Sequence, residues 1–118
     1  MDREPRTTNV PVNMYRTEDR LMVAALMPGL QPDDISIDVG ADGQLQLRGE
    51  LRGRLKDWKD VLQEEWQAGG SQRTLDLPVA VDGAAGRATY ENGVLVVVLP
   101  VAPALVAGRF APSPGQGH

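Results

Sequence analysis

The residues that could perform catalysis are few in this chain of 118 residues. The single histidine is His118, the last residue, and there is no cysteine. A Ser-His-Asp triad, a thiol nucleophile and a metal site of His or Cys ligands therefore lack their essential groups. Carboxylate pairs occur at Asp33-Asp34 and Glu64-Glu65, but neighbouring residues of a strand or turn point apart, whereas a catalytic pair must face one substrate. We expect no catalytic residue, no metal site and no enzyme activity.

Nucleotide and nucleic acid sites are not indicated either. The glycine-rich stretches 40–43, 68–70 and 82–86 lack the Lys-Ser/Thr ending of a P-loop and the strand-to-helix context of a dinucleotide site. Trp58 and Trp66 could stack on bases, but the charges around them are balanced and the net charge is −4, whereas phosphate binding requires a basic face. We expect no cofactor and no nucleic acid partner.

Length and composition indicate a single domain with one core. The N-terminal segment is polar and charged, without the apolar region of a signal peptide. The most apolar stretch, 94–107, is shorter than the ~20 residues of a membrane helix and contains Pro100 and Pro103. Because a chain without cysteine needs no oxidising compartment, we expect it in the cytoplasm and not in a membrane.

Alternation of apolar and polar residues runs through most of the chain and predicts β-strands. It is found at 35–39, 44–51, 73–81 and 87–99, and residues 12–27 suggest two more strands around a polar turn at 17–20. Asp42-Gly43 and Asn92-Gly93 are strong signals for tight hairpin turns. We predict an all-β fold, an immunoglobulin-like antiparallel sandwich of about seven to eight strands.

The segment 52–70 breaks this pattern and is predicted to be a long insertion. Leu55, Trp58, Leu62 and Trp66 recur at helical spacing, whereas in a strand Leu62 and Trp66 would share one face and Val61 the other. Packing on its own sandwich and packing on a second copy both stay open. For the whole chain we expect a disordered arm at 1–10, one domain at 11–101 and a flexible extension at 102–118.

The last strand of the predicted sandwich is apolar on both faces. If Leu95, Val97 and Leu99 face the core, then Val94, Val96 and Val98 point away from it, and residues 21–27 are likewise apolar on both sides. The second face could be covered by the insertion, by the C-terminal tail, by another subunit or by an unfolded protein.

Several motifs resemble the small heat shock protein family, also called the Hsp20 or alpha-crystallin domain family. Residues 88–95, ATYENGVL, fit its signature A-x-x-x-N-G-V-L and continue into its V-x-L-P ending at 97–100. Residues 27–39 resemble its L-P-G-V and D-I-x-V-x-V motifs, residues 45–50 resemble L-x-I-x-G-E, and residues 73–78 resemble R-x-x-x-L-P. The likeness is to bacterial-type members and extends from about residue 12 to 101.

Departures from the family pattern affect the expected assembly. Ser71 stands where members usually have an aromatic residue, and Leu26 where they have an acidic one. About ten polar residues precede the first predicted strand, so we expect no long apolar N-terminal arm, and 105–107 is a weak substitute for the C-terminal I-x-I motif. The resemblance therefore implies a homodimer rather than a large oligomer.

The function implied by the resemblance is that of an ATP-independent stress-response chaperone that holds partly unfolded clients on apolar surface. The predicted client-binding residues are Val94, Val96, Val98, Ile35, Ile37, Val39 and Tyr90. The predicted dimer interface, which in the family pairs the insertion with the partner's first strand, is Val12, Met14, Tyr15, Trp58, Val61, Leu62, Trp66 and Arg73. The alternative is a co-chaperone resembling the CS/p23 proteins, or a structural interaction module, which would bind a folded partner.

Overall fold

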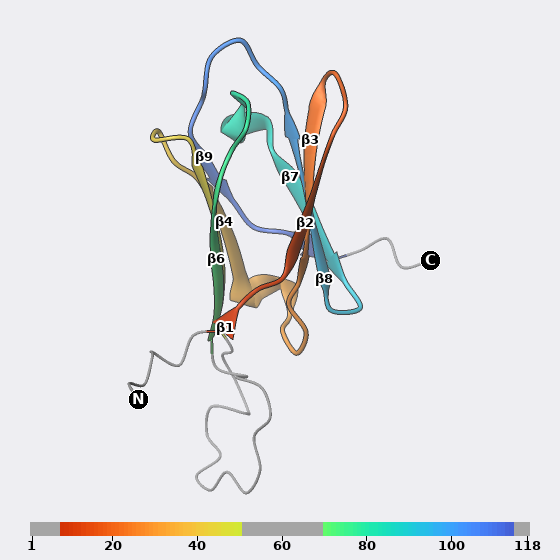
Figure 1. Ribbon diagram of the computed structural model, residues 1–118. Helices are drawn as coiled ribbons and strands as arrows, with labels where there is room; N and C mark the ends of the chain where they lie inside the picture. Colours follow the sequence, from red (N-terminus) through yellow and green to blue (C-terminus); the bar gives the residue numbers. More distant parts are fainter. Residues whose placement is uncertain (1–7, 51–69, 115–118) are drawn as a thin grey trace, which may run out of the picture.

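The computed structural model describes residues 8–50 and 70–114, which form two β-sheets that face each other (Figure 1). The first, called the β5 sheet, has the order β1 (Thr8–Asn9), β6 (Gly70–Asp76), β5 (Gln44–Glu50), β4 (Ile35–Val39), β9 (Gly108–Phe110). The second, called the β8 sheet, has the order β10 (Ser113–Pro114), β7 (Arg87–Glu91), β8 (Val94–Pro100), β3 (Arg20–Leu26), β2 (Val12–Arg16). Two short 3-10 turns, η1 (Pro32–Asp34) and η3 (Gly83–Ala85), lie in the connections. The predicted antiparallel sandwich is confirmed.

Both predicted hairpins are present. β4 pairs antiparallel with β5, and Gly43 in their turn has φ = 83°. β7 pairs antiparallel with β8, and the turn residues Asn92 and Gly93 have φ = 55° and 82°. Positive φ at both central residues is what a type I′ turn requires, and Asn and Gly tolerate it best. These local signals therefore set the register of both hairpins.

The core lies between the sheets and is made by alternate residues of each strand. Leu95, Val97 and Leu99 of β8 have no exposed surface, and their neighbours on β3 point the same way. The β5 sheet contributes the facing side chains, among them Leu45 and Leu47. Each large aliphatic side chain buried in this way stabilises the fold by about 1.5–3 kcal/mol.

The N-terminal segment joins the fold earlier than the sequence indicated. β1 pairs in parallel with β6, and the side chain of Val10 is only 2% exposed. Arg73 Nη1 donates a hydrogen bond of 2.8 Å to the carbonyl of Val10. The predicted domain start at residue 11 is therefore wrong, because residues 8–10 already belong to the sandwich.

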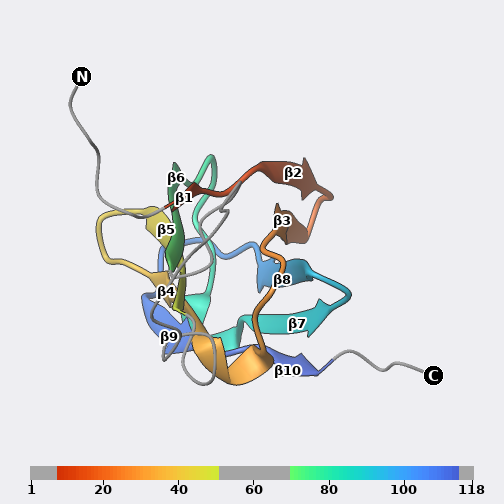
Figure 2. The same cartoon turned by 90° about the horizontal axis from the view of Figure 1, so that it is seen from below.

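The C-terminal segment is not the flexible extension that was predicted. β9 pairs antiparallel with β4 of the β5 sheet, and β10 pairs in parallel with β7 of the β8 sheet. Residues 105–114, called the strap, therefore cross from one sheet to the other on the side away from β1 and β2 (Figure 2). Phe110 lies against the backbone of Gly86, where an added Cβ would approach its ring to 2.6 Å. The expectation of flexibility is wrong for this part of the tail.

The insertion lies outside the described residues except for Gly70, which opens β6. The choice between a helix and an exchanged strand for this segment therefore stays a prediction.

Candidate binding surface

Tyr90 lies in the core rather than on a binding surface. Its side chain is 7% exposed, and its hydroxyl donates to the carbonyl of Met27 and accepts from the backbone N–H of Leu30 at 3.2 Å. The N–H of Met27 in turn donates to the carbonyl of Gly93 at 2.8 Å. The prediction that Tyr90 binds clients from the surface is wrong, because this side chain fixes the 27–30 turn against the β7–β8 hairpin.

Three further residues predicted to bind clients are also in the core. Ile35, Ile37 and Val39 of β4 are exposed by 2%, 0% and 1%. They alternate with Ser36 and Asp38, so β4 turns its apolar face inward and its polar face outward. The prediction is wrong for these three side chains, because a half-buried strand has one apolar face and the core takes it.

Val94, Val96 and Val98 do point away from the core. Along β8 the burial alternates strictly, with these three half-buried and the residues between them fully buried. Their cross-strand neighbours on β3 are Leu26, Ala24 and Met22. Side chains directly opposite in a sheet touch, so the two strands form one continuous apolar surface.

This surface, called the outer apolar face, is the largest concentration of exposed apolar side chains in the described part of the chain. Tyr15, Met22 and Leu26 are exposed by 54%, 39% and 51%. Its members are Tyr15 on β2, Met22, Ala24 and Leu26 on β3, and Val94, Val96 and Val98 on β8. Met22 and Leu26 were not among the predicted site residues, although the apolar run 21–27 was a signal for them.

A shallow groove of about 280 Å³ lies at one end of the outer apolar face. It is lined by residues of the β2 and β3 strands and by Val94, and its walls include Pro11, Asn13, Ala24 and Leu26. The walls are mostly apolar, so the groove suits an apolar or aromatic side chain.

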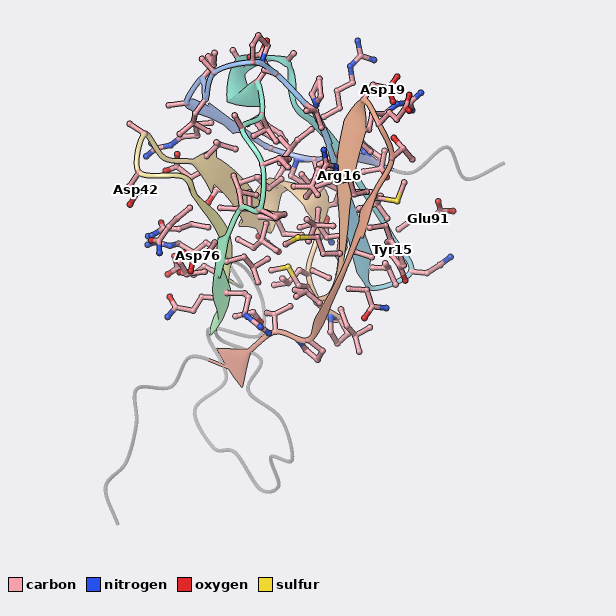
Figure 3. All side chains as sticks on the ribbon, turned by 45° about the horizontal axis from the view of Figure 1, so that its top comes forward. Tyr15, Arg16, Asp19, Asp42, Asp76 and Glu91 are labelled. Atoms are coloured by element: carbon pink, nitrogen blue, oxygen red, sulfur yellow. The ribbon has the colours of Figure 1, made fainter. Side chains whose placement is uncertain are left out.

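The opposite face of the sandwich is polar. On the β5 sheet, Ser36, Asp38, Gln46, Arg48 and Arg109 line a depression of about 230 Å³. Arg109 forms an exposed ion pair with Asp38 at 3.1 Å, which contributes little to stability. In Figure 3, Tyr15 and Glu91 lie on the side of the β8 sheet, whereas Asp42 and Asp76 lie on the other side. The two outer faces therefore differ strongly in polarity.

The acidic side chains of residues 8–50 and 70–114 were considered as possible ligands or catalytic groups from the sequence. No three His, Cys, Asp or Glu side chains gather there into a possible metal site. Of the first carboxylate pair, Asp34 is buried and accepts a hydrogen bond of 2.9 Å from the N–H of Gln31, so it holds the η1 turn. Within the same ranges, none of the helices has the length and apolar character needed to cross a membrane.

The residues predicted for the dimer interface differ in their surroundings, and half of them lie outside the described residues. β2 forms an edge of the β8 sheet, where Val12 and Met14 are half-buried against the core and Tyr15 is exposed. Arg73 is half-buried and binds the backbone of its own chain. Four residues, Trp58, Val61, Leu62 and Trp66, lie outside the described residues.

Fold and surface together define a β-sandwich with one apolar and one polar outer face. Residues 13–108 match the model of the Hsp20/alpha crystallin family, and the chain belongs to this family. It is 40% identical over 85 residues to an alpha-crystallin of Mycobacterium tuberculosis, an alignment covering 71% of this chain and 56% of that protein. It is 32% identical over 97 residues to the 18.1 kDa class I heat shock protein of Arabidopsis thaliana, covering 81% of this chain and 60% of that protein. The chain thus spans less than two thirds of these relatives.

Solved structures agree with the fold. A Del-C4 mutant of hsp14.1 from Sulfolobus solfatataricus P2 superposes with a TM-score of 0.68 at 27% identity, covering 81% of this chain and 78% of that one. Heat shock protein 16.0 from Schizosaccharomyces pombe superposes with a TM-score of 0.67 at 21% identity, covering 88% and 74%. The second likeness concerns the fold alone.

Proposed function

We propose that this protein is an ATP-independent holdase, a chaperone that binds partly unfolded proteins and keeps them from aggregating. The observation that carries the proposal is the outer apolar face, where Tyr15, Met22 and Leu26 are exposed beside the three outward valines of β8. Membership of the small heat shock family supports it. The proposal includes cytoplasmic location and a role in stress response, and it requires neither a catalytic group nor a cofactor.

Capture of this kind is driven by burial of apolar surface. At roughly 25 cal/mol per Å², covering about 300 Å² of apolar area is worth several kcal/mol before the cost of ordering the client. An interaction of this size is reversible, and it is unselective because apolar burial has no directional requirement. The net charge of −4 keeps the chain itself in solution.

Suppression of aggregation is the direct test. A client denatured by heat or by a reductant is followed by light scattering at increasing ratios of this protein and without ATP. We expect scattering to fall and to approach zero near an equimolar ratio. No suppression at equimolar or higher ratios would overturn the proposal, and stoichiometric binding to one folded chaperone would instead support the co-chaperone alternative.

Replacing Val96 and Val98 by threonine tests the surface itself. Val96→Thr with Val98→Thr places hydroxyls on the outer apolar face at nearly unchanged volume, and we expect roughly fivefold or more of this variant to be needed for half-suppression. The reverse change on the same face, Thr89→Val, is the matched control and should improve capture. Circular dichroism and thermal melting check that both variants are folded. Unchanged capture by the double variant would mean that this face is not the client site.

We also propose that the protein is a homodimer in which edge strand β2 contributes to the interface. The support is that β2 has a neighbour in the β8 sheet on one side only. The four aromatic and aliphatic residues predicted for the interface between 58 and 66 belong to the same proposal. Sedimentation at micromolar concentration should give twice the mass of one chain, and a particle of a dozen or more subunits would contradict it.

A further inference from the structure

The outer apolar face and the residues that border it on β2 and β7 lie in three rows that run across the strands. The cross-strand register places these rows as follows: Leu26, Val94 and Glu91 in the first, Asn13, Ala24, Val96 and Thr89 in the second, and Tyr15, Met22, Val98 and Arg87 in the third. The larger apolar side chains thus stand in the first and third rows, and the middle row is made of smaller ones.

The charges at the border of this face have opposite signs at its two ends. Arg87 and Glu91 are both exposed and both point outward from β7, four residues apart, which in a strand is about 13 Å. Neither makes an ion pair with any other residue in the described ranges. One end of the outer apolar face therefore has a cation and the other an anion without an intramolecular partner there.

A two-fold rotation about the middle row makes this face complementary to itself. Turning a second copy about an axis along that row exchanges the first and third rows, so Arg87 of one copy faces Glu91 of the other, and the converse pair forms as well. Met22 and Val98 then lie over Leu26 and Val94. The two sheets would pack in the way that the two layers of a β-sandwich pack, about 10 Å apart.

The same rotation places Tyr15 over a groove of the second copy. Along β2 the rotation brings the third row of one copy over the first row of the other. Tyr15 of one copy therefore lies over the groove beside Pro11 and Leu26 of the other. Tyr15 is 54% exposed, and this groove of about 280 Å³ has mostly apolar walls. Exposed tyrosines that enter such grooves are common anchors of protein interfaces. Shape and charge therefore favour the same arrangement.

We propose that a second copy of this chain covers the outer apolar face through this two-fold pairing. The face measures about 14 by 13 Å between backbone positions, which is much less than the ~800 Å² per partner of a standard interface. The pairing is accordingly weak and reversible. The pairing uses side chains above the sheet and not the backbone of β2, so it leaves the β2 edge free. If that edge forms a homodimer, the pairing joins two such dimers.

Under the proposed holdase function, on which this step rests, pairing and client capture compete for one surface. A free chain hides its apolar face on another copy, and a client displaces that copy because it covers the same side chains. The self-pairing would thus keep an apolar surface soluble between encounters with clients.

Charge reversal tests the pairing without any client. Arg87→Glu and Glu91→Arg each turn two attractive contacts per pair into repulsive ones, and we expect each to weaken the pairing roughly tenfold or more in a sedimentation concentration series. The double variant, Arg87→Glu with Glu91→Arg, restores both attractions and should return close to the wild-type value. Arg48→Glu, the same change on the polar face, is the matched control and should have no effect on mass.

The outcomes separate the pairing from the holdase function. A wild-type chain whose mass never doubles beyond the unit formed through the β2 edge would overturn the pairing. Single reversals that pair as well as wild type, or a double variant as weak as the singles, would overturn it too. If the pairing follows the expected pattern but no variant suppresses aggregation, the pairing stands and the holdase function fails. If both hold, the single reversals should suppress aggregation at lower protein concentration than wild type.

Discussion

At the scale of single residues, Tyr90 joins two segments that are far apart in the chain. Its hydroxyl bridges the carbonyl of Met27 and the N–H of Leu30, and so attaches the 27–30 turn to the last hairpin. Both segments contain the motifs by which the sequence resembles its family, which gives those motifs a structural reason. Buried polar groups left without a partner are costly, so the hydrogen bonds of this residue contribute to the stability of the fold.

Tyr90→Phe is predicted to destabilise the protein. The change removes one hydroxyl and leaves a carbonyl and an N–H in a largely buried site without their partner, which costs about 1–3 kcal/mol. Urea unfolding followed by fluorescence or circular dichroism measures it. Tyr15→Phe is the matched control, because the exposed Tyr15 hydroxyl accepts a hydrogen bond of 3.2 Å from Asn13 of the same strand and has no other partner within residues 8–50 and 70–114. It should change stability by less than about 0.5 kcal/mol. Equal effects of the two changes would contradict this role.

Local features of single residues could be predicted from the sequence, whereas their long-range contacts could not. The turn at Asn92-Gly93 was predicted correctly because its signal is local: both residues adopt positive φ. The burial of Tyr90 was missed because its partners lie 60 and 63 residues earlier. Likewise, the sequence could place Ile35, Ile37 and Val39 on one face of a strand, but only the packing of the sheets makes that face the inner one.

At the scale of elements, the strap was the least predictable part of the fold. Its Pro/Gly-rich sequence has the composition of a disordered tail. In the structure, however, glycine permits close backbone contact: the N–H of Gly83 donates to the carbonyl of Val106 at 2.7 Å, and Val106 donates to Val81 at 2.9 Å. Amino-acid composition predicts the local conformational preference of a segment but not its contacts with distant parts of the chain. A segment that is held by such backbone contacts therefore cannot be recognised from its composition.

Gly83→Ala is predicted to loosen the strap. An added Cβ would lie 2.7 Å from the carbonyl oxygen of Val106 and 2.9 Å from the N of Gly108, and backbone atoms cannot turn aside. Overpacking of this kind costs about 1–3 kcal/mol, so we expect roughly tenfold faster trypsin cleavage after Arg109. Ala84→Ser changes the exposed neighbour and should leave the rate unchanged. Because the new Cβ also approaches Val39, circular dichroism must confirm that the sandwich is intact, and an unchanged cleavage rate in a folded variant would contradict the contact.

At the scale of the whole molecule, the sandwich is two-sided. The outer apolar face covers the β8 sheet, whereas the β5 sheet carries Ser36, Asp38, Gln46 and Arg48 outward. The sequence predicted which β8 residues point out, because period-2 alternation fixes that. It did not predict the combined surface, since the register that sets Met22 beside Val98 depends on strands separated by most of the chain.

A two-sided molecule should bind clients on one side only, and the absence of cysteine allows this to be tested cleanly. Thr89→Cys and Thr74→Cys each give a chain with one thiol, both at exposed threonines but on opposite faces, beside Val96 and beside Gln46. With an environment-sensitive dye attached, the label at position 89 should shift to the blue when a denatured client is added, because the client removes water from around it. The label at position 74 should not shift. Equal shifts at both positions would mean that clients coat the chain without regard to its apolar face, and a shift at 74 alone would place the client site on the polar sheet.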